Sequence, residues 1–110
     1  MTTNNDATQG GKIMVRVDSD LEDLIPGFLE NRAHDIKSIE GALARKDYET
    51  IAQLGHTMKG VGGGYGFDAI TDIGGSIEKA AKTENSVQIR QSIDELADYL
   101  ARIEIMFEST

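Results

Sequence analysis

The chain has 110 residues and a net charge of −8, and 39% of its residues are hydrophobic and 27% charged. This length and composition fit one globular domain with a core of modest size. The absence of cysteine excludes disulfides and thiolate chemistry, and the negative charge argues against partners such as nucleic acid or an anionic membrane surface.

The N-terminal segment is polar and ends in Gly10-Gly11, so we expect residues 1–11 to form a disordered tail and residues 12–110 to form one domain. This segment has no basic region followed by an apolar run, so it does not look like a signal peptide. The longest apolar runs are only a few residues, so nothing is expected to cross a membrane. We therefore expect a cytoplasmic protein that acts through other proteins.

The domain is expected to begin with an extended segment, because Ile13, Val15 and Val17 alternate with other residues and give one apolar side. Such a segment is too short to build a sheet alone, so it should lie along the rest of the domain. The acidic cluster at residues 18–20 predicts the start of a short helix over residues 21–24. Ile25 precedes Pro26 and is expected outside the α region, with Pro26 in the first turn of the next helix.

Four long helices are predicted after this point, over about residues 26–45, 48–63, 67–82 and 87–107. Each carries an apolar stripe at helical spacing, and the last has the most regular one: Ile89, Ile93, Leu96, Leu100, Ile103 and Phe107. Lys46-Asp47 makes the first turn, with Asp47 as a helix N-cap, and the connections are only two to four residues long. Short connections favour antiparallel neighbours, so the sequence predicts an all-α fold, an antiparallel up-down four-helix bundle.

The third helix contains the most informative feature of the chain, which is a single histidine among five glycines. Gly55, Gly60, Gly62, Gly63 and Gly64 lie close to His56, although each glycine inside a helix costs roughly 1 kcal/mol relative to alanine. Bare backbone of this kind allows another group to approach closely. At about 100° per residue, His56, Lys59, Gly60 and Gly63 share a face that is centred roughly 130° from the apolar face of the helix. The sequence therefore predicts an exposed imidazole with a lysine one turn away.

An exposed imidazole is substantially neutral at cytoplasmic pH, and its free nitrogen is a nucleophile that needs no separate base. Phosphoryl transfer depends mainly on positioning and on positive charge near the moving oxygens, which Lys59 can supply. The sequence shows no cluster of acids for Mg²⁺, so the metal would have to come from a partner. His56 and its neighbours thus suit a group that receives and passes on a phosphoryl.

The run His56-Thr57-Met58-Lys59-Gly60, followed by Tyr65-Gly66 and by Ile77-Glu78, resembles the histidine-containing phosphotransfer (HPt) family over roughly residues 19–107. The resemblance implies that His56 accepts a phosphoryl group from a receiver-domain aspartate or a kinase and passes it to another receiver. It implies that Lys59 steadies the phosphoryl group and that Gly60 and Gly63 give the receiver room. The implied partners are response-regulator receivers and a sensor or hybrid histidine kinase. The resemblance also implies that Mg²⁺ is bound by the receiver and that this chain binds no cofactor. It implies further that the chain has no kinase activity of its own and is a monomer.

Other interpretations of the same residues remain open. The chain could be a docking bundle that binds a receiver or kinase without being phosphorylated. It could be the dimerisation domain of a sensor kinase, although such domains usually have an acidic residue directly after the histidine, where this chain has Thr57. Glu30 and His34 lie one helical turn apart, but two ligands are too few for a structural zinc site. The glycine run lacks the last glycine of a dinucleotide fingerprint and the Lys-Ser/Thr of a phosphate-binding loop.

Overall fold

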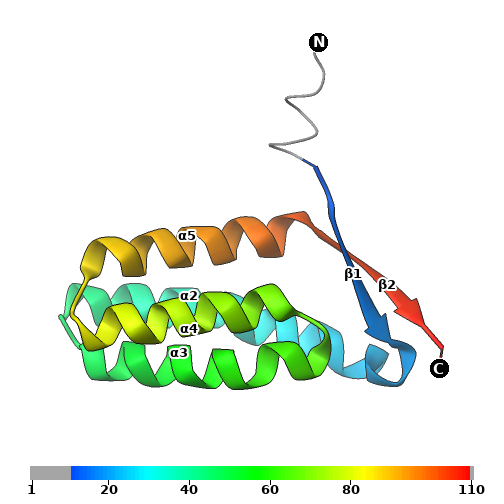
Figure 1. Cartoon of the computed structure of the whole chain (residues 1–110), viewed down its shortest axis with the longest axis horizontal. Coiled ribbons are helices and arrows are strands. Elements are labelled where there is room, and N and C mark those ends of the chain that lie inside the picture. Colours follow the sequence, from blue (N-terminus) through cyan, green and yellow to red (C-terminus); the bar gives the residue numbers. More distant parts are fainter. Residues whose placement is uncertain (1–10, 110) are drawn as a thin grey trace, which may run out of the picture.

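The structure, a computed structural model, describes residues 11–109, and four helices make up most of it (Figure 1). The tail expected over residues 1–11 therefore lies outside the described residues, apart from Gly11. In chain order the elements are β1 (Ile13–Asp18), the 3₁₀-helix η1 (Ser19–Leu24), α2 (Ile25–Ala44), α3 (Tyr48–Gly62), the 3₁₀-helix η2 (Gly63–Tyr65), α4 (Asp68–Lys82), α5 (Ser86–Arg102) and β2 (Ile103–Glu108). In Figure 1 the four long helices lie alongside one another, and short connections join them.

The turns before α3 and α5 are fixed by side chains that cap the following helix. Asp47 accepts a hydrogen bond from the backbone N–H of Thr50 at 3.2 Å, which confirms Asp47 as the predicted N-cap of α3. Asn85 does the same for α5, accepting from the N–H of Gln88 at 3.1 Å. These carboxylate and amide oxygens satisfy backbone donors that have no partner within the helix, so the starts of α3 and α5 are well defined.

The prediction that Ile25 lies outside the α region is wrong. Ile25 has φ −66° and ψ −45°, and it is the first residue of α2. The steric preference of a residue before proline is weak enough for packing to override it. Here the N–H of Ile25 continues the helical turn of η1 by donating to the carbonyl of Glu22, and its side chain is buried in the core.

The fold is not purely helical, because β1 and β2 form a two-stranded parallel sheet in which Ile13 pairs with Ile103 and Asp18 with Glu108. The prediction of an all-α bundle is confirmed for the four long helices, and this small sheet is an addition to it. The predicted extent of the last helix is wrong, because α5 ends at Arg102 instead of continuing to Phe107. The alternation of apolar residues over 103–107 fits a strand as well as a helix, and β1 offers the backbone partners that a strand needs. Val15 and Val17 are buried, so packing on the helices supports a sheet too small to be stable alone.

The core lies between the four helices and is built mainly from isoleucine. Every apolar stripe predicted from the sequence contributes to it, and the largest fully buried side chains include Ile39, Ile51, Met58, Phe67, Ile70, Ile77, Ile89, Ile93 and Leu96. Ile51 and Met58 belong to α3 and face inward. The opposite face of α3 is therefore free to carry a site.

Candidate functional site

His56 projects from the middle of α3 into solvent, with 69% of its side chain exposed. Lys59, one turn further along, is half-exposed, and Gly60 and Gly63 are also at the surface. The prediction of a shared outer face is confirmed for His56, Lys59 and Gly60, whereas Gly63 is exposed but lies in η2, beyond the end of α3. A Cβ atom added to Gly60 would meet nothing within 4 Å, so the backbone here is open to an approaching molecule.

Other glycines have a different role, because they let α3 and α4 approach each other closely. A Cβ atom on Gly55 would lie 2.7 Å from the backbone nitrogen of Glu78 and 2.8 Å from the carbonyl oxygen of Gly74. A Cβ atom on Gly74 would lie 2.5 Å from the backbone nitrogen of Lys59, and one on Gly62 would lie 2.6 Å from that of Thr71. Real side chains do not fit at these distances. Glycine is therefore required at these three positions, where the backbones of the two helices come closest.

The hydroxyl of Thr71, on α4, secures the same contact near the end of α3. It donates to the carbonyl of Lys59 at 3.0 Å and accepts from the N–H of Gly63 at 2.8 Å. The carbonyl of Lys59 lies in the last turn of α3, where carbonyls lack partners within the helix, and Gly63 follows directly after that turn. Thr71 therefore holds the backbone beside Lys59 in place against α4.

The close approach of α4 places Glu78 beside His56, and this contact is the centre of the site. One carboxylate oxygen of Glu78, Oε2, lies 3.0 Å from Nδ1 of His56 and 3.3 Å from Nζ of Lys82. The other, Oε1, lies 3.4 Å from Nζ of Lys59. Only 13% of the Glu78 side chain is exposed. One carboxylate thus connects the imidazole to two ammonium groups.

Glu78 is ionised at neutral pH. Partial desolvation acts to raise its pKa, but hydrogen bonds and charge from Lys82 and Lys59 outweigh that effect and lower the pKa below its ordinary value. A carboxylate can only accept, so the contact with His56 is a hydrogen bond in which Nδ1–H donates. In the neutral ring the lone pair is then on Nε2. Glu78 therefore fixes the tautomer that presents Nε2 to solvent.

The sequence analysis assigned no role to Glu78 or Lys82, although it quoted Ile77-Glu78 as part of a motif. Their separation of four residues indicates an ion pair on one helix face, and the structure contains that pair. What the spacing could not show is that the pair faces His56 across two helices. That placement depends on the glycine contacts between α3 and α4.

Two hollows flank His56. On one side a hollow of about 590 Å³ is lined by residues of α3 and α4, among them His56, Thr57, Glu78 and Lys82. On the other a hollow of about 390 Å³ lies between α2 and α3, with Phe28, Val61 and Tyr65 in its lining. Phe28 stacks on Tyr65 with ring centroids 4.4 Å apart. The second hollow also has polar residues in its lining, among them Asn31 and Arg32, and it shares Thr57 with the hollow of His56.

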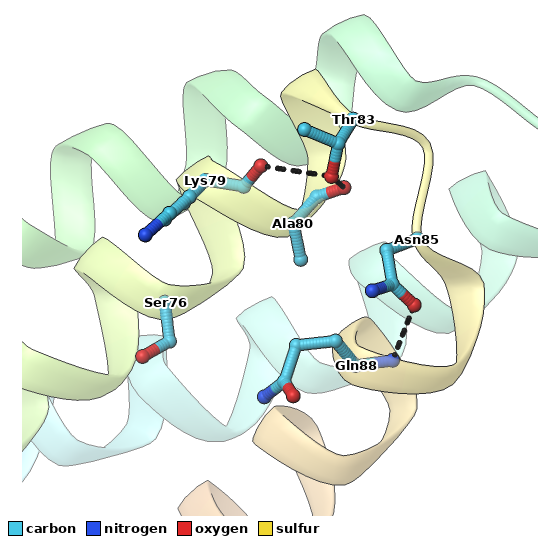
Figure 2. A pocket seen from close by; sticks show the side chains of 6 residues that line it. All are labelled: Ser76, Lys79, Ala80, Thr83, Asn85 and Gln88. Carbon is cyan, nitrogen blue, oxygen red and sulfur yellow. Dashed lines mark hydrogen bonds between the residues drawn. The ribbon is translucent and has the colours of Figure 1, made fainter.

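A third hollow, shown in Figure 2, lies where α4 ends and α5 begins. Two of its polar side chains hold the turn itself, because Asn85 caps α5 and the hydroxyl of Thr83 donates to the carbonyl of Ala80 at 3.2 Å. Lys79 also lines it. These contacts give the hollow a structural role at the turn.

The other histidine, His34, is exposed on α2. In residues 11–109 no three His, Cys, Asp or Glu side chains come together in a way that could hold a metal ion. Within the same residues, none of the helices combines the length and apolar character that spanning a membrane requires.

In a comparison with known protein families, the Hpt domain model matches residues 23–105, a segment that includes all four long helices. Searches of curated proteins and of solved structures gave no match. The matched segment contains His56, Lys59, Glu78 and Lys82.

Proposed function

Because this chain belongs to the Hpt domain family, whose members are phosphotransfer carriers, we propose that it is a phosphorelay intermediate. In this proposal His56 accepts a phosphoryl group from a receiver-domain aspartate, or from a sensor or hybrid histidine kinase, and passes it to another receiver. The chain itself would neither bind ATP nor act as a kinase. We place it in the cytoplasm, as a monomer.

The observation that carries the proposal is the hydrogen bond between Nδ1 of His56 and Glu78. It leaves the Nε2 lone pair directed outward on a side chain that is largely exposed. In the transfer, Nε2 forms a bond to phosphorus while the bond between phosphorus and the aspartyl oxygen breaks. The aspartate leaves as a carboxylate, and the proton stays on Nδ1, where Glu78 balances the positive charge of the ring.

Lys59 supports the same reaction from the next turn of α3. Its ammonium group contacts the carboxylate that also binds His56, and in this proposal its flexible side chain turns from there to the phosphoryl oxygens on Nε2. Phosphoryl transfer relies on positioning and on positive charge of this kind. We expect Mg²⁺ to be held by the receiver and to neutralise further charge there.

The surface around His56 suits a receiver as the partner. Gly60, on α3, and Gly63, at the start of η2, carry no side chain that would stand in the way, and the nearby hollow with Phe28, Tyr65 and Arg32 in its lining offers apolar and polar area for docking. A receiver must bring its aspartate to within bonding distance of Nε2, which bulky side chains on this face would prevent. The bare face is consistent with that demand.

The direct test is to mix the chain with phosphorylated receivers and Mg²⁺ and to follow transfer of the label. We expect acid-labile phosphate on the wild-type chain and on the His34→Gln control, and none on His56→Gln. Label that persists on His56→Gln, or failure with every receiver of the host, would overturn the proposal. Receiver binding that survives His56→Ala without any phosphorylation of the wild type would instead identify a docking module.

A further inference from the structure

The positive charges around Glu78 outnumber its single negative charge while His56 is unphosphorylated. Its carboxylate carries one negative charge, yet it contacts two ammonium groups in addition to the imidazole N–H. Lys59 reaches it from α3, and Lys82 reaches it from α4 on the same oxygen that accepts from His56. With a neutral imidazole, the cluster therefore has an excess of one positive charge next to the nucleophile.

A phosphoryl group on Nε2 would reverse that balance. It adds about −1.5 to −2 charge at neutral pH and three strong acceptor oxygens. Those oxygens would repel the carboxylate of Glu78 and attract the nearest cations. Lys82 is well placed to respond, because its side chain is 67% exposed and its flexible stem is free to turn.

We propose that Lys82 is a second phosphoryl-contacting residue, which leaves Glu78 for the phosphoryl oxygens once His56 is phosphorylated. This inference rests on the proposed function of His56. The exchange breaks and forms no covalent bond: Glu78 keeps the Nδ1 proton as its partner, and the ammonium group of Lys82 moves from one anion to another. Lys82 and His56 line the same hollow, so the ammonium group and the imidazole face a common space.

Lys79 provides a matched control. It lies on the same helix, one residue after Glu78, and its loss changes the net charge by the same amount. Within the described residues, however, Lys79 makes no ion pair with Glu78 and does not line the hollow of His56. It lines the hollow of Figure 2 and a further one, whose lining also includes Lys59, Gly75, Glu78 and Lys82. An effect specific to contact with the phosphoryl group should therefore appear at Lys82 and be absent at Lys79.

The test uses phosphoramidate, which phosphorylates exposed histidine without a protein donor, and follows the phosphohistidine signal by ³¹P NMR. We expect Lys82→Gln to shorten the half-life of the phosphorylated form about two- to fivefold, the size that an exposed charge pair gives. Loss of phosphoryl reduces the charge on its oxygens, so a cation that contacts them stabilises the starting state more. Lys79→Gln should match the wild type, and Lys82→Arg should retain most of the lifetime.

A second measurement separates direct contact from an indirect effect through Glu78. In a Glu78→Gln background, Lys82→Gln should still shorten the half-life, because the phosphoryl group and not the carboxylate is the partner that matters. An unchanged half-life in Lys82→Gln, an equal loss in Lys79→Gln, or disappearance of the effect in the Glu78→Gln background would each overturn the inference. Because phosphoramidate needs no receiver, these outcomes are independent of whether transfer from a receiver succeeds.

Discussion

Replacing Gly55 by alanine should separate the packing role of the glycines from their surface role. A Cβ atom at Gly55 would lie 2.7 Å from the backbone nitrogen of Glu78 and 2.8 Å from the carbonyl oxygen of Gly74. Ordinary contact begins at about 3.4 Å, and both atoms are backbone, so α3 and α4 must separate by several tenths of an ångström. Overpacking of this kind costs about 1–3 kcal/mol.

Gly60→Ala is the matched control, because the same methyl group there meets nothing within 4 Å. It should stabilise the helix by about 0.5–1 kcal/mol through propensity alone. The same gain at Gly55 offsets part of the strain. We therefore expect Gly55→Ala to be less stable than Gly60→Ala by about 1–3 kcal/mol, because the propensity gain cancels between them.

Urea unfolding followed by far-UV circular dichroism measures this difference, and a phosphotransfer assay measures its consequence. Separation of the helices should move Glu78 away from Nδ1 of His56, so Gly55→Ala should also accept phosphoryl more slowly than Gly60→Ala. Equal stability of the two variants would refute the conclusion that bare backbone at Gly55 sets the spacing of the helices. Equal transfer rates despite lower stability would refute the link from spacing to the site.

The remaining predictions concern the site surface, the acidic group and the sheet. Gly60→Leu or Gly63→Leu should slow transfer from a receiver with no loss of helicity by circular dichroism; normal rates would show that this face is not where the receiver docks. Lys59→Ala should shorten the lifetime of phosphohistidine measured by ³¹P NMR, and an unchanged lifetime would remove Lys59 from the site. The pKa of Glu78 is lower in the folded chain than its ordinary value of 4.5, so ionised Glu78 stabilises the fold at pH values above 4.5. This contribution to stability is lost as the pH falls through the pKa of the folded chain. The difference in Tm between wild type and Glu78→Gln should accordingly be present at neutral pH and vanish well below 4.5; a difference that persists there would contradict the ion cluster. Val17→Ala should lower stability by about 2 kcal/mol in urea unfolding, because Val17 is buried where the sheet meets the helices, and a neutral result would show that the sheet adds nothing to the fold.

The helices could be predicted from the sequence because their signals are local. Asp47 caps α3 through an interaction that spans three residues, and the apolar stripes repeat every turn, so both can be recognised without knowing the fold. The outward direction of His56 follows from the same periodicity. These features depend only on neighbours along the chain.

Features that depend on distant residues could not be predicted in the same way. Residues 103–107 are compatible with helix and strand, and only the presence of β1 selects the strand. Glu78 reaches His56 because glycines on two different helices face each other, which no spacing within one helix reveals. Ile25 adopts a helical conformation because the turn of η1 and the core both favour it against its local preference.

The parallel pairing of β1 with β2 has a consequence for the order in which the chain assembles. Ile13 can pair with Ile103 only after the helices between them have packed and brought the two strands together. The helices can therefore form without the sheet, whereas the sheet cannot form without the helices. During synthesis β1, which contains Val15 and Val17, has no strand partner until residues 103–108 have emerged. On unfolding the same pair should open first, and amide hydrogen exchange should be faster in the strands than in α3 or α4.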